Sequence, residues 1–283
     1  MNFSESFFHT SFLALFFVTV LIVLIAIEVG LRFGRWSRSL KKSETDAPVG
    51  TMVGAMLGLL AFMLAFTFQM AASQYDARRM AALKESNAIG TAYLRADFLP
   101  EPGRSQIRAF FRQYVDMRLE ATQTEKLESS IVRSEQILDS LWVQASTLAD
   151  KNADTPLTAL FVSALNEVID LHSERLMLAT SFRIPEIIWI ALLFVMFFSM
   201  LAVGYQFGID GTRSILGTLV IALTSSAVIV LIADLDSPRR GLIKTNQAPL
   251  IALQKSLNKG TADPLLKSAL AAAHANVSAA TQK

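Results

Sequence analysis

The sequence predicts an all-α membrane protein with four transmembrane helices and a helical bundle inserted between the second and the third. Of the 283 residues, 52% are hydrophobic and 18% are charged. This is too apolar for an ordinary soluble domain and too charged for a chain that lies wholly in lipid, so we expect one part of each kind. The apolar residues gather in four stretches, and a long polar section separates the second from the third.

Each of the four apolar stretches is long enough to span a bilayer, because a helix needs roughly 20 residues to cross hydrocarbon about 30 Å thick. The first lacks a basic leader and a small-residue cleavage site, so we expect a retained helix rather than a signal peptide. A turn around Gly208, Asp210 and Gly211 joins the last two stretches. The predicted spans cover residues 11–31, 50–72, 186–204 and 214–233.

The second span is expected to continue beyond the membrane as one helix over residues 50–98. A helix satisfies its own backbone hydrogen bonds, so only its side chains must change solvent where it leaves lipid. Pro100, Pro102 and Gly103 then interrupt the helix. The predicted domains are a first transmembrane pair over 1–73, a helical bundle over 74–184, a second transmembrane pair over 185–235, and an amphipathic helix with a flexible tail over 236–283.

The polar section has the residue spacing of three further helices. One follows Gly103 and is apolar on one face, one covers roughly 126–149, and one begins at Pro156. After the fourth span, a turn at 237–241 precedes a short amphipathic helix from about Pro249. The apolar face of the first of these helices is expected to contain Ile107, Phe110, Phe111, Tyr114, Val115 and Leu119.

Composition argues against several classes of function. The chain has no cysteine, which excludes disulfides and thiolate metal sites. Its three histidines, His9, His172 and His274, lack the spacing of metal ligands, so we expect no metal and no cofactor. A net charge of +2 supplies no field for nucleic acid. Sequence motifs of hydrolases, kinases and metalloproteases are missing, so we expect no enzyme activity.

The distribution of basic residues does not decide which side of the membrane the helical section faces. The loop after the first span holds Arg32, Arg35, Arg38, Lys41 and Lys42. The positive-inside rule favours a cytoplasmic position for this loop, which would put both termini and the helical section outside. Basic residues also crowd the opposite side of the predicted spans, and long segments count for less in this rule, so the orientation stays open.

The second span carries two patterns of possible function. Gly50, Gly54 and Gly58 follow one another at four-residue spacing, which lets helix backbones approach closely, either within one subunit or between subunits around an axis. Phe62 and Phe66 lie one turn apart, with Met70 one turn further. Such a stripe ordinarily faces lipid or a core. The alternative is an apolar constriction of a pore, which can gate by dewetting.

Glu28 is an ionisable residue inside the first span. An acid in a membrane segment is a functional candidate by default. Glu28 lies near the end of its span, however, and Arg32 follows four residues later. We therefore expect an ion pair at the membrane interface.

Asp234 and Asp236 end the fourth span, where their charge opposes the helix dipole. Arg78 and Arg79 follow the second span on the same predicted side of the membrane. Salt bridges between the two pairs are the favoured compensation. A divalent cation held by the two carboxylates is the alternative, on a weaker signal.

Four segments together resemble the bacterial bestrophin-like family, a group of membrane proteins of unknown function. In the family's order they are GTMVGAMLGLLAFMLAFTFQMAASQYDARR, ESNAIGTAYLRADFLPEP, LIADLDSPRRGLI and QAPLIALQKSL, and the resemblance runs from about residue 48 to 258. The family is distantly similar to bestrophins. Those are pentameric anion channels with four membrane helices per subunit and a cytoplasmic helical domain between the second and the third.

The resemblance implies a pore lined by the second membrane helix. Phe62 and Phe66 match the apolar neck of the bestrophin pore, and Gly58 stands where a larger residue is usual. Asp76 and the two arginines after it match the charged residues that follow this helix in bestrophins. The mouth of the pore would then carry Asp76, Arg78, Arg79, Asp234 and Asp236.

Two functional hypotheses follow. The first is an oligomeric, anion-leaning ion channel in the bacterial inner membrane, whose partners are the lipid bilayer, further copies of the chain (five by resemblance) and inorganic anions. The second is a membrane sensor or scaffold that binds a ligand or a partner through its helical section. The sequence shows no output domain for a sensor, so the channel is the first choice.

Overall fold

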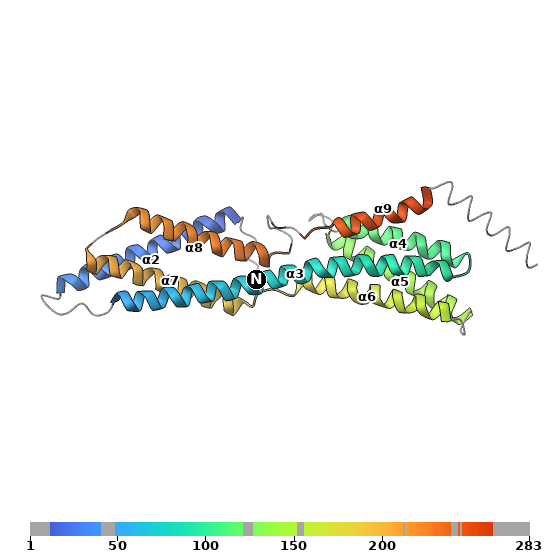
Figure 1. Ribbon diagram of the computed structural model, residues 1–283, viewed down its shortest axis with the longest axis horizontal. Coiled ribbons are helices and arrows are strands. Elements are labelled where there is room, and N and C mark those ends of the chain that lie inside the picture. The colour runs from blue at the N-terminus through green and yellow to red at the C-terminus, as the bar shows by residue number, and fades with distance from the viewer. Residues whose placement is uncertain are drawn as a thin grey trace, which may run out of the picture. The chain divides into compact units, whose positions relative to one another are not determined.

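A computed structural model describes residues 12–40, 49–120, 127–151, 156–211, 213–238, 243 and 245–262. Over these residues the chain forms eight α-helices and one 3₁₀ turn and contains no strand, which confirms the all-α prediction (Figure 1). Lys41, Lys42, His9 and His274 lie outside the described residues, as does most of the turn expected at 237–241. The helices are α2 (Phe12–Leu40), α3 (Val49–Arg95), α4 (Gly103–Glu120), α5 (Leu127–Lys151), α6 (Pro156–Thr180), α7 (Glu186–Asp210), α8 (Ile215–Asp236) and α9 (Ala248–Ala262), with the 3₁₀ turn η1 at Ala96–Phe98.

The chain divides into two compact units. The first comprises the residues up to Ala77 and those from Leu178 to Thr245, and the second comprises the rest. Helices α2, α7 and α8 and the first part of α3 build the first unit. These four helices are long and apolar enough to cross a membrane, as the sequence predicts, so we call this part the membrane unit.

Helices α2 and α7 touch backbone to backbone. A Cβ atom added to Gly204 would lie 2.0 Å from the carbonyl oxygen of Ile27, and one added to Gly30 would lie 2.0 Å from that of Leu201. Gly34 and Gly208 meet in the same way one turn further along, with a Cβ on Gly208 only 2.7 Å from the Cα of Gly34. Two pairs of glycines at four-residue spacing therefore interlock, which is the arrangement that draws membrane helices together.

The connection between α7 and α8 differs in one respect from the expected turn. Gly208 belongs to α7 and packs against α2, because its lack of a side chain serves the helix crossing. Gly211 ends α7 in the left-handed conformation, with φ of 68°, which glycine adopts without steric cost. Ser214 then caps α8, since its hydroxyl oxygen accepts a hydrogen bond of 3.1 Å from the backbone N–H of Gly217.

The second unit is a helical bundle made from the last part of α3 with α4, α5, α6 and α9. Its core is apolar, and Phe111, Tyr114 and Phe161 are among its largest fully buried side chains. The predicted apolar face of α4 is present: Ile107, Phe111, Tyr114 and Val115 are buried, and Phe110 and Leu119 pack at the edge of the core.

Helix α9 packs against α4 in this bundle. The side-chain amide of Gln254 donates a 2.6 Å hydrogen bond to the carboxylate of Asp116 on α4. At the beginning of α9, the hydroxyl of Ser86 on α3 donates to the carbonyl oxygen of Pro249 at 3.0 Å. The C-terminal helix is thus part of the second unit.

We expect Gly204→Ala to lower the thermal unfolding midpoint of the detergent-solubilised protein. The new methyl group would collide with the backbone of α2, which has no rotamer to move aside, and overpacking of this kind typically costs about 1–3 kcal/mol. The control is Gly90→Ala, where the nearest atom to a new Cβ is Leu253 Cδ1 at 3.4 Å. The control should keep or raise the midpoint, because alanine favours a helix over glycine by roughly 0.5–1 kcal/mol. Equal midpoints for the two variants would contradict the assigned crossing.

Candidate functional site

One face of the membrane part of α3 is open in the protomer. Phe62 and Phe66 have 65% and 51% of their surfaces exposed, and their rings stack with centroids 6.4 Å apart at an angle of 15°. The opposite face holds the buried residues Val53, Leu60 and Ala71. Of the most apolar 18 residues of α3, 11% are buried, against 28–39% in α2, α7 and α8. Helix α3 is therefore the membrane helix that the protomer covers least.

The glycines of this helix meet little within the protomer. Among the described residues, none would have an atom within 4 Å of a Cβ atom added to Gly54 or Gly58, apart from the neighbours in the chain and the backbone of the helix itself. A Cβ on Gly50 would meet only the side-chain nitrogen of Gln206, at 3.4 Å. The close helix packing inside the protomer occurs at α2 and α7 instead, so a second helix could approach α3 at Gly54 and Gly58 from outside.

Met70 differs from the two phenylalanines. It is partly buried and packs against the core of the membrane unit, as does Tyr75 a little further along α3. The three residues of the predicted stripe are therefore not equivalent. The open aromatic surface consists of Phe62 and Phe66, and Met70 lies at its margin.

The charged residues that follow the apolar part of α3 separate into two groups by burial. Asp76 and Arg79 are exposed, and Arg78 is buried. The first group is available to solvent or to an ion. Arg78 is largely shielded from solvent at the residue where the second unit begins.

Asp234 and Asp236 are buried at the end of α8, and their carboxylates accept hydrogen bonds from backbone N–H groups. A carboxylate oxygen of Asp236 accepts a 3.0 Å hydrogen bond from the N–H of Ile184, just before α7. Asp234 accepts one of 3.1 Å from the N–H of Ile243. Their expected salt bridges to Arg78 and Arg79 stay a prediction. Within the described ranges, no three His, Asp or Glu side chains lie close enough to hold a metal ion.

A buried ionic cluster in the second unit was not predicted. Glu85 on α3 is fully buried and lies beyond the apolar stretch of its helix. Arg118 on α4 approaches it with Nε 3.0 Å from Oε1, and Arg175 on α6 donates to Oε2 through Nη1. The hydroxyl of Tyr114 donates to Oε1 at 2.7 Å. The Glu85 carboxylate of α3 therefore bonds to side chains of both α4 and α6.

Two further groups complete the cluster. Since the Tyr114 hydroxyl donates to Glu85, its oxygen accepts a 2.8 Å hydrogen bond from Nδ1–H of His172. Arg175 also donates through Nη2 to the side-chain oxygen of Gln247 at 2.9 Å, just before α9. The cluster therefore extends from α3 to the beginning of α9.

The cluster sets the charge of its members. Burial raises the pKa of the Glu85 carboxyl, but the positive charges of Arg118 and Arg175 and the bond from Tyr114 outweigh this, and the pKa falls below its ordinary value. Burial, and then the Glu85 carboxylate, raise the pKa of Tyr114 well above 10. Burial, and then the charge of Arg118, lower the pKa of His172 from 6.5 to about 4. At neutral pH, Glu85 is ionised, Tyr114 is a phenol and His172 is neutral.

The cluster is expected to be sensitive to the loss of any one member. Its acid, bases and phenol are bonded to one another, and removing one partner of a buried ion pair typically costs about 3–5 kcal/mol because the other charge stays buried. A signal in the sequence could have pointed to Glu85. It occupies the same helical stripe as Ala82, Ile89 and Ala92, all of which are buried.

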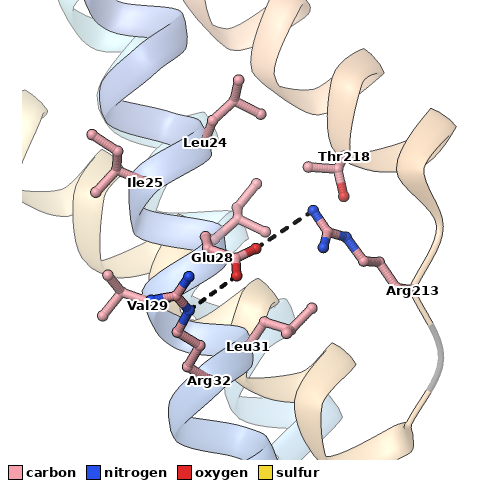
Figure 2. A pocket seen from close by; sticks show the side chains of 9 residues that line it. Leu24, Ile25, Glu28, Val29, Leu31, Arg32, Arg213 and Thr218 are labelled. Carbon is pink, nitrogen blue, oxygen red and sulfur yellow. Dashed lines mark hydrogen bonds and ion pairs between the residues drawn. The ribbon is translucent and has the colours of Figure 1, made fainter.

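A pocket of about 440 Å³ lies between α2 and α8 in the membrane unit (Figure 2). At its polar end, Glu28 pairs with Arg32 as the sequence predicts, with Arg32 Nε 3.1 Å from Oε1. Arg213 makes a second ion pair with Glu28 at 3.4 Å, which was not predicted because Arg213 is far away in the sequence. None of the residues that line this pocket belongs to α3, so the pocket and the open face of α3 are two different sites.

We expect the folded protein to lose stability as the pH falls from about 6.5 to about 4, in part through His172. The unfolded chain takes up this proton near pH 6.5, whereas the folded protein resists it until about pH 4. The contribution is thus complete above pH 6.5 and lost by pH 4, and a shift of this size corresponds to about 3 kcal/mol. Thermal unfolding midpoints of His172→Gln should fall less steeply with pH than those of the unaltered protein. His274→Gln, the control, should follow the unaltered protein, and parallel profiles for all three would refute the assignment.

Comparisons with known proteins agree with this architecture. A family model described as the Bestrophin-like domain matches residues 18–250. One mutant of a bacterial bestrophin homologue from Klebsiella pneumoniae aligns with a TM-score of 0.60 at 16% identity, over 89% of this chain and 99% of that chain. A second mutant gives 0.61 at 16%, over 90% and 100%. The structure phased with zinc gives 0.60 at 15%, over 89% and 98%.

A comparison with curated proteins gives no match. At 15–16% identity the solved structures establish the fold alone. The family model, in contrast, covers most of the chain, including all four membrane helices in whole or in part. The resemblance noted in the sequence is thereby confirmed, and the chain belongs to the family of proteins with a Bestrophin-like domain.

Proposed function

We propose that this protein is a homo-oligomeric, anion-leaning ion channel of the bacterial inner membrane, with a pore lined by α3. The observation that carries the proposal is the open face of α3. Phe62 and Phe66 point away from the core of the protomer, and no other helix in the described part of the chain comes close to Gly54 or Gly58 of the same helix. The family, and the bestrophin fold it shares, support a channel and an assembly of several copies, five by resemblance.

Packing in lipid supports assembly through α3. Apolar side chains gain little by leaving hydrocarbon for one another, so membrane helices associate where small residues let backbones approach. Gly54 and Gly58 offer such a surface outside the protomer. If copies of the chain meet there around an axis, Phe62 and Phe66 line the axis as successive apolar rings, with Met70 one turn further. Rings of this kind constrict a pore and can gate it by dewetting.

The charges near the end of the apolar part of α3 support a preference for anions. Arg79 is exposed there beside Asp76, and the buried Arg78 adds a second positive charge to the same turn of the helix. A narrow path with apolar walls focuses the field of such charges, because little water screens them. Asp234 and Asp236 also belonged to the expected pore mouth. We propose a structural role for them, since both are buried and accept backbone N–H bonds.

The sensor or scaffold alternative has less support. It requires a ligand or partner site in the second unit, and the buried polar cluster around Glu85 is bonded within itself. The hydroxyl of Tyr114 is the cluster's one candidate nucleophile, but it is fully buried and its pKa is raised well above 10, which favours a non-enzymatic protein. A second protein that copurifies in fixed ratio would favour the scaffold over the channel.

We expect Phe62→Ala/Phe66→Ala to increase chloride efflux from liposomes that contain the purified protein. Removing both rings widens the proposed constriction and makes it easier to wet. The measurement is efflux per oligomer at matched protein density, with the oligomer verified in mild detergent. Equal efflux for the double variant and the unaltered protein would contradict the constriction, and a monomer in mild detergent would contradict the channel.

The matched control for this experiment is Phe194→Ala/Phe198→Ala on α7. These two residues are also four positions apart, their ring centroids lie 4.5 Å apart, and both side chains are exposed in the protomer. The control removes the same number of ring atoms from a helix that the proposal does not place along the pore. Its efflux should match that of the unaltered protein.

A further inference from the structure

The pocket between α2 and α8 has two chemically different ends. Its apolar wall includes Leu24, Ile25 and Val29 of α2, and its polar end holds Glu28, Arg32 and Arg213 (Figure 2). The volume of about 440 Å³ lies within the range of roughly 300–1,000 Å³ that is usual for small-molecule sites. The pocket is therefore shaped for a molecule that is itself part apolar and part polar.

Glu28 holds the two arginines on either side of the polar end. Arg32 Nε is 3.1 Å from one carboxylate oxygen, and Arg213 Nη2 is 3.4 Å from the other. A guanidinium has five N–H donors, so a bond from one nitrogen leaves donors for a second acceptor. The three side chains carry a formal charge of +1 together. A ligand group with one negative charge would neutralise the site.

The two arginines lie where apolar sequence gives way to polar sequence. The apolar run of α2 ends at Leu31, directly before Arg32, and that of α8 begins at Ile215, two residues after Arg213. Both side chains are solvent-accessible, with 76% and 47% of their surfaces exposed. In a bilayer, this boundary is the level at which acyl chains end and headgroups begin.

We propose that this pocket binds one anionic phospholipid. The phosphate lies between Arg32 and Arg213, and an acyl chain follows the apolar wall of α2. The net positive charge selects the headgroup, because a zwitterionic lipid brings a cation that the two guanidinium groups repel. Glu28 restrains both arginines and at the same time weakens the site by cancelling one of their charges. The inference is independent of ion conduction, since it uses no residue of α3.

The test is native mass spectrometry of the assembled protein released from detergent that holds equal amounts of phosphatidylglycerol and phosphatidylcholine. We expect the unaltered protein to retain phosphatidylglycerol preferentially. Arg32→Gln/Arg213→Gln should lose this preference, by about fivefold for each arginine, as expected for a basic residue close to an anionic lipid. The control Arg35→Gln removes the same charge from the same end of α2 but from outside the pocket, and it should retain the lipid.

Glu28→Gln gives the sharpest result because its expected effect has the opposite sign. The substitution raises the formal charge of the pocket from +1 to +2, so retention of phosphatidylglycerol should rise by about fivefold. A merely structural role of Glu28 predicts lower retention. The oligomer mass in the same spectra shows whether each variant is still assembled.

Three outcomes would overturn the proposal. One is a lack of preference for phosphatidylglycerol in the unaltered protein. Another is displacement of the lipid by inorganic phosphate at equal concentration, which would assign the pocket to a free anion. The third is a change in oligomer mass without loss of lipid in the double arginine variant, which would assign the pocket to contact with a neighbouring copy.

Discussion

The backbone contact between α2 and α7 is the constraint on which the membrane unit depends. Lipid offers apolar side chains almost the same surroundings as a protein core, so burial alone does not order the helices. The protomer places Gly30, Gly34, Gly204 and Gly208 at this single crossing, where no side chain would fit. Helix α8 then packs along α2, and together they form the walls of the charged pocket. Gly54 and Gly58 of α3 meet no other described residue of the protomer, so the way the unit folds leaves one helix available for assembly.

The second unit is ordered by a different interaction. In water, the hydrophobic effect builds its core, and an apolar bundle can pack in several registers. Glu85 restricts this choice, because its buried charge must meet Arg118, Arg175 and Tyr114 at one particular depth. Buried ion pairs seldom increase stability over apolar packing, but they can select one arrangement among several. We interpret the cluster as such a register device. Through Gln247, its influence extends to the beginning of α9.

More of the fold than of the candidate sites could be predicted from the sequence. Helix boundaries can be predicted from apolar runs and from prolines. Helix α3 continues from Val49 to Arg95, and Pro100 and Pro102 follow shortly after its end. Contacts between distant residues leave no such local trace. Gly30 and Gly204 are separated by most of the chain, and only the glycine spacing on each helix hinted at their meeting. Arg213 reaches Glu28, and Tyr114 meets Glu85 and His172, through tertiary packing that periodicity does not encode. The sequence marked Asp234 and Asp236 as charges, and it did not indicate that they also accept the backbone N–H groups of Ile243 and Ile184.

The proposed channel requires that α3 helices from several copies surround a common axis, each with its open face toward that axis. The chain contains no cysteine, so single cysteines can be introduced without any background. Phe66→Cys should form covalent dimers in native membranes on oxidation, or on treatment with a short bismaleimide where the sulfurs lie too far apart for a disulfide. Phe194→Cys, on an exposed position of α7, should remain monomeric under both treatments. We expect dimers from Phe66→Cys alone. A monomeric Phe66→Cys protein beside an efficiently cross-linked Phe194→Cys protein would place α7, and not α3, at the subunit contact.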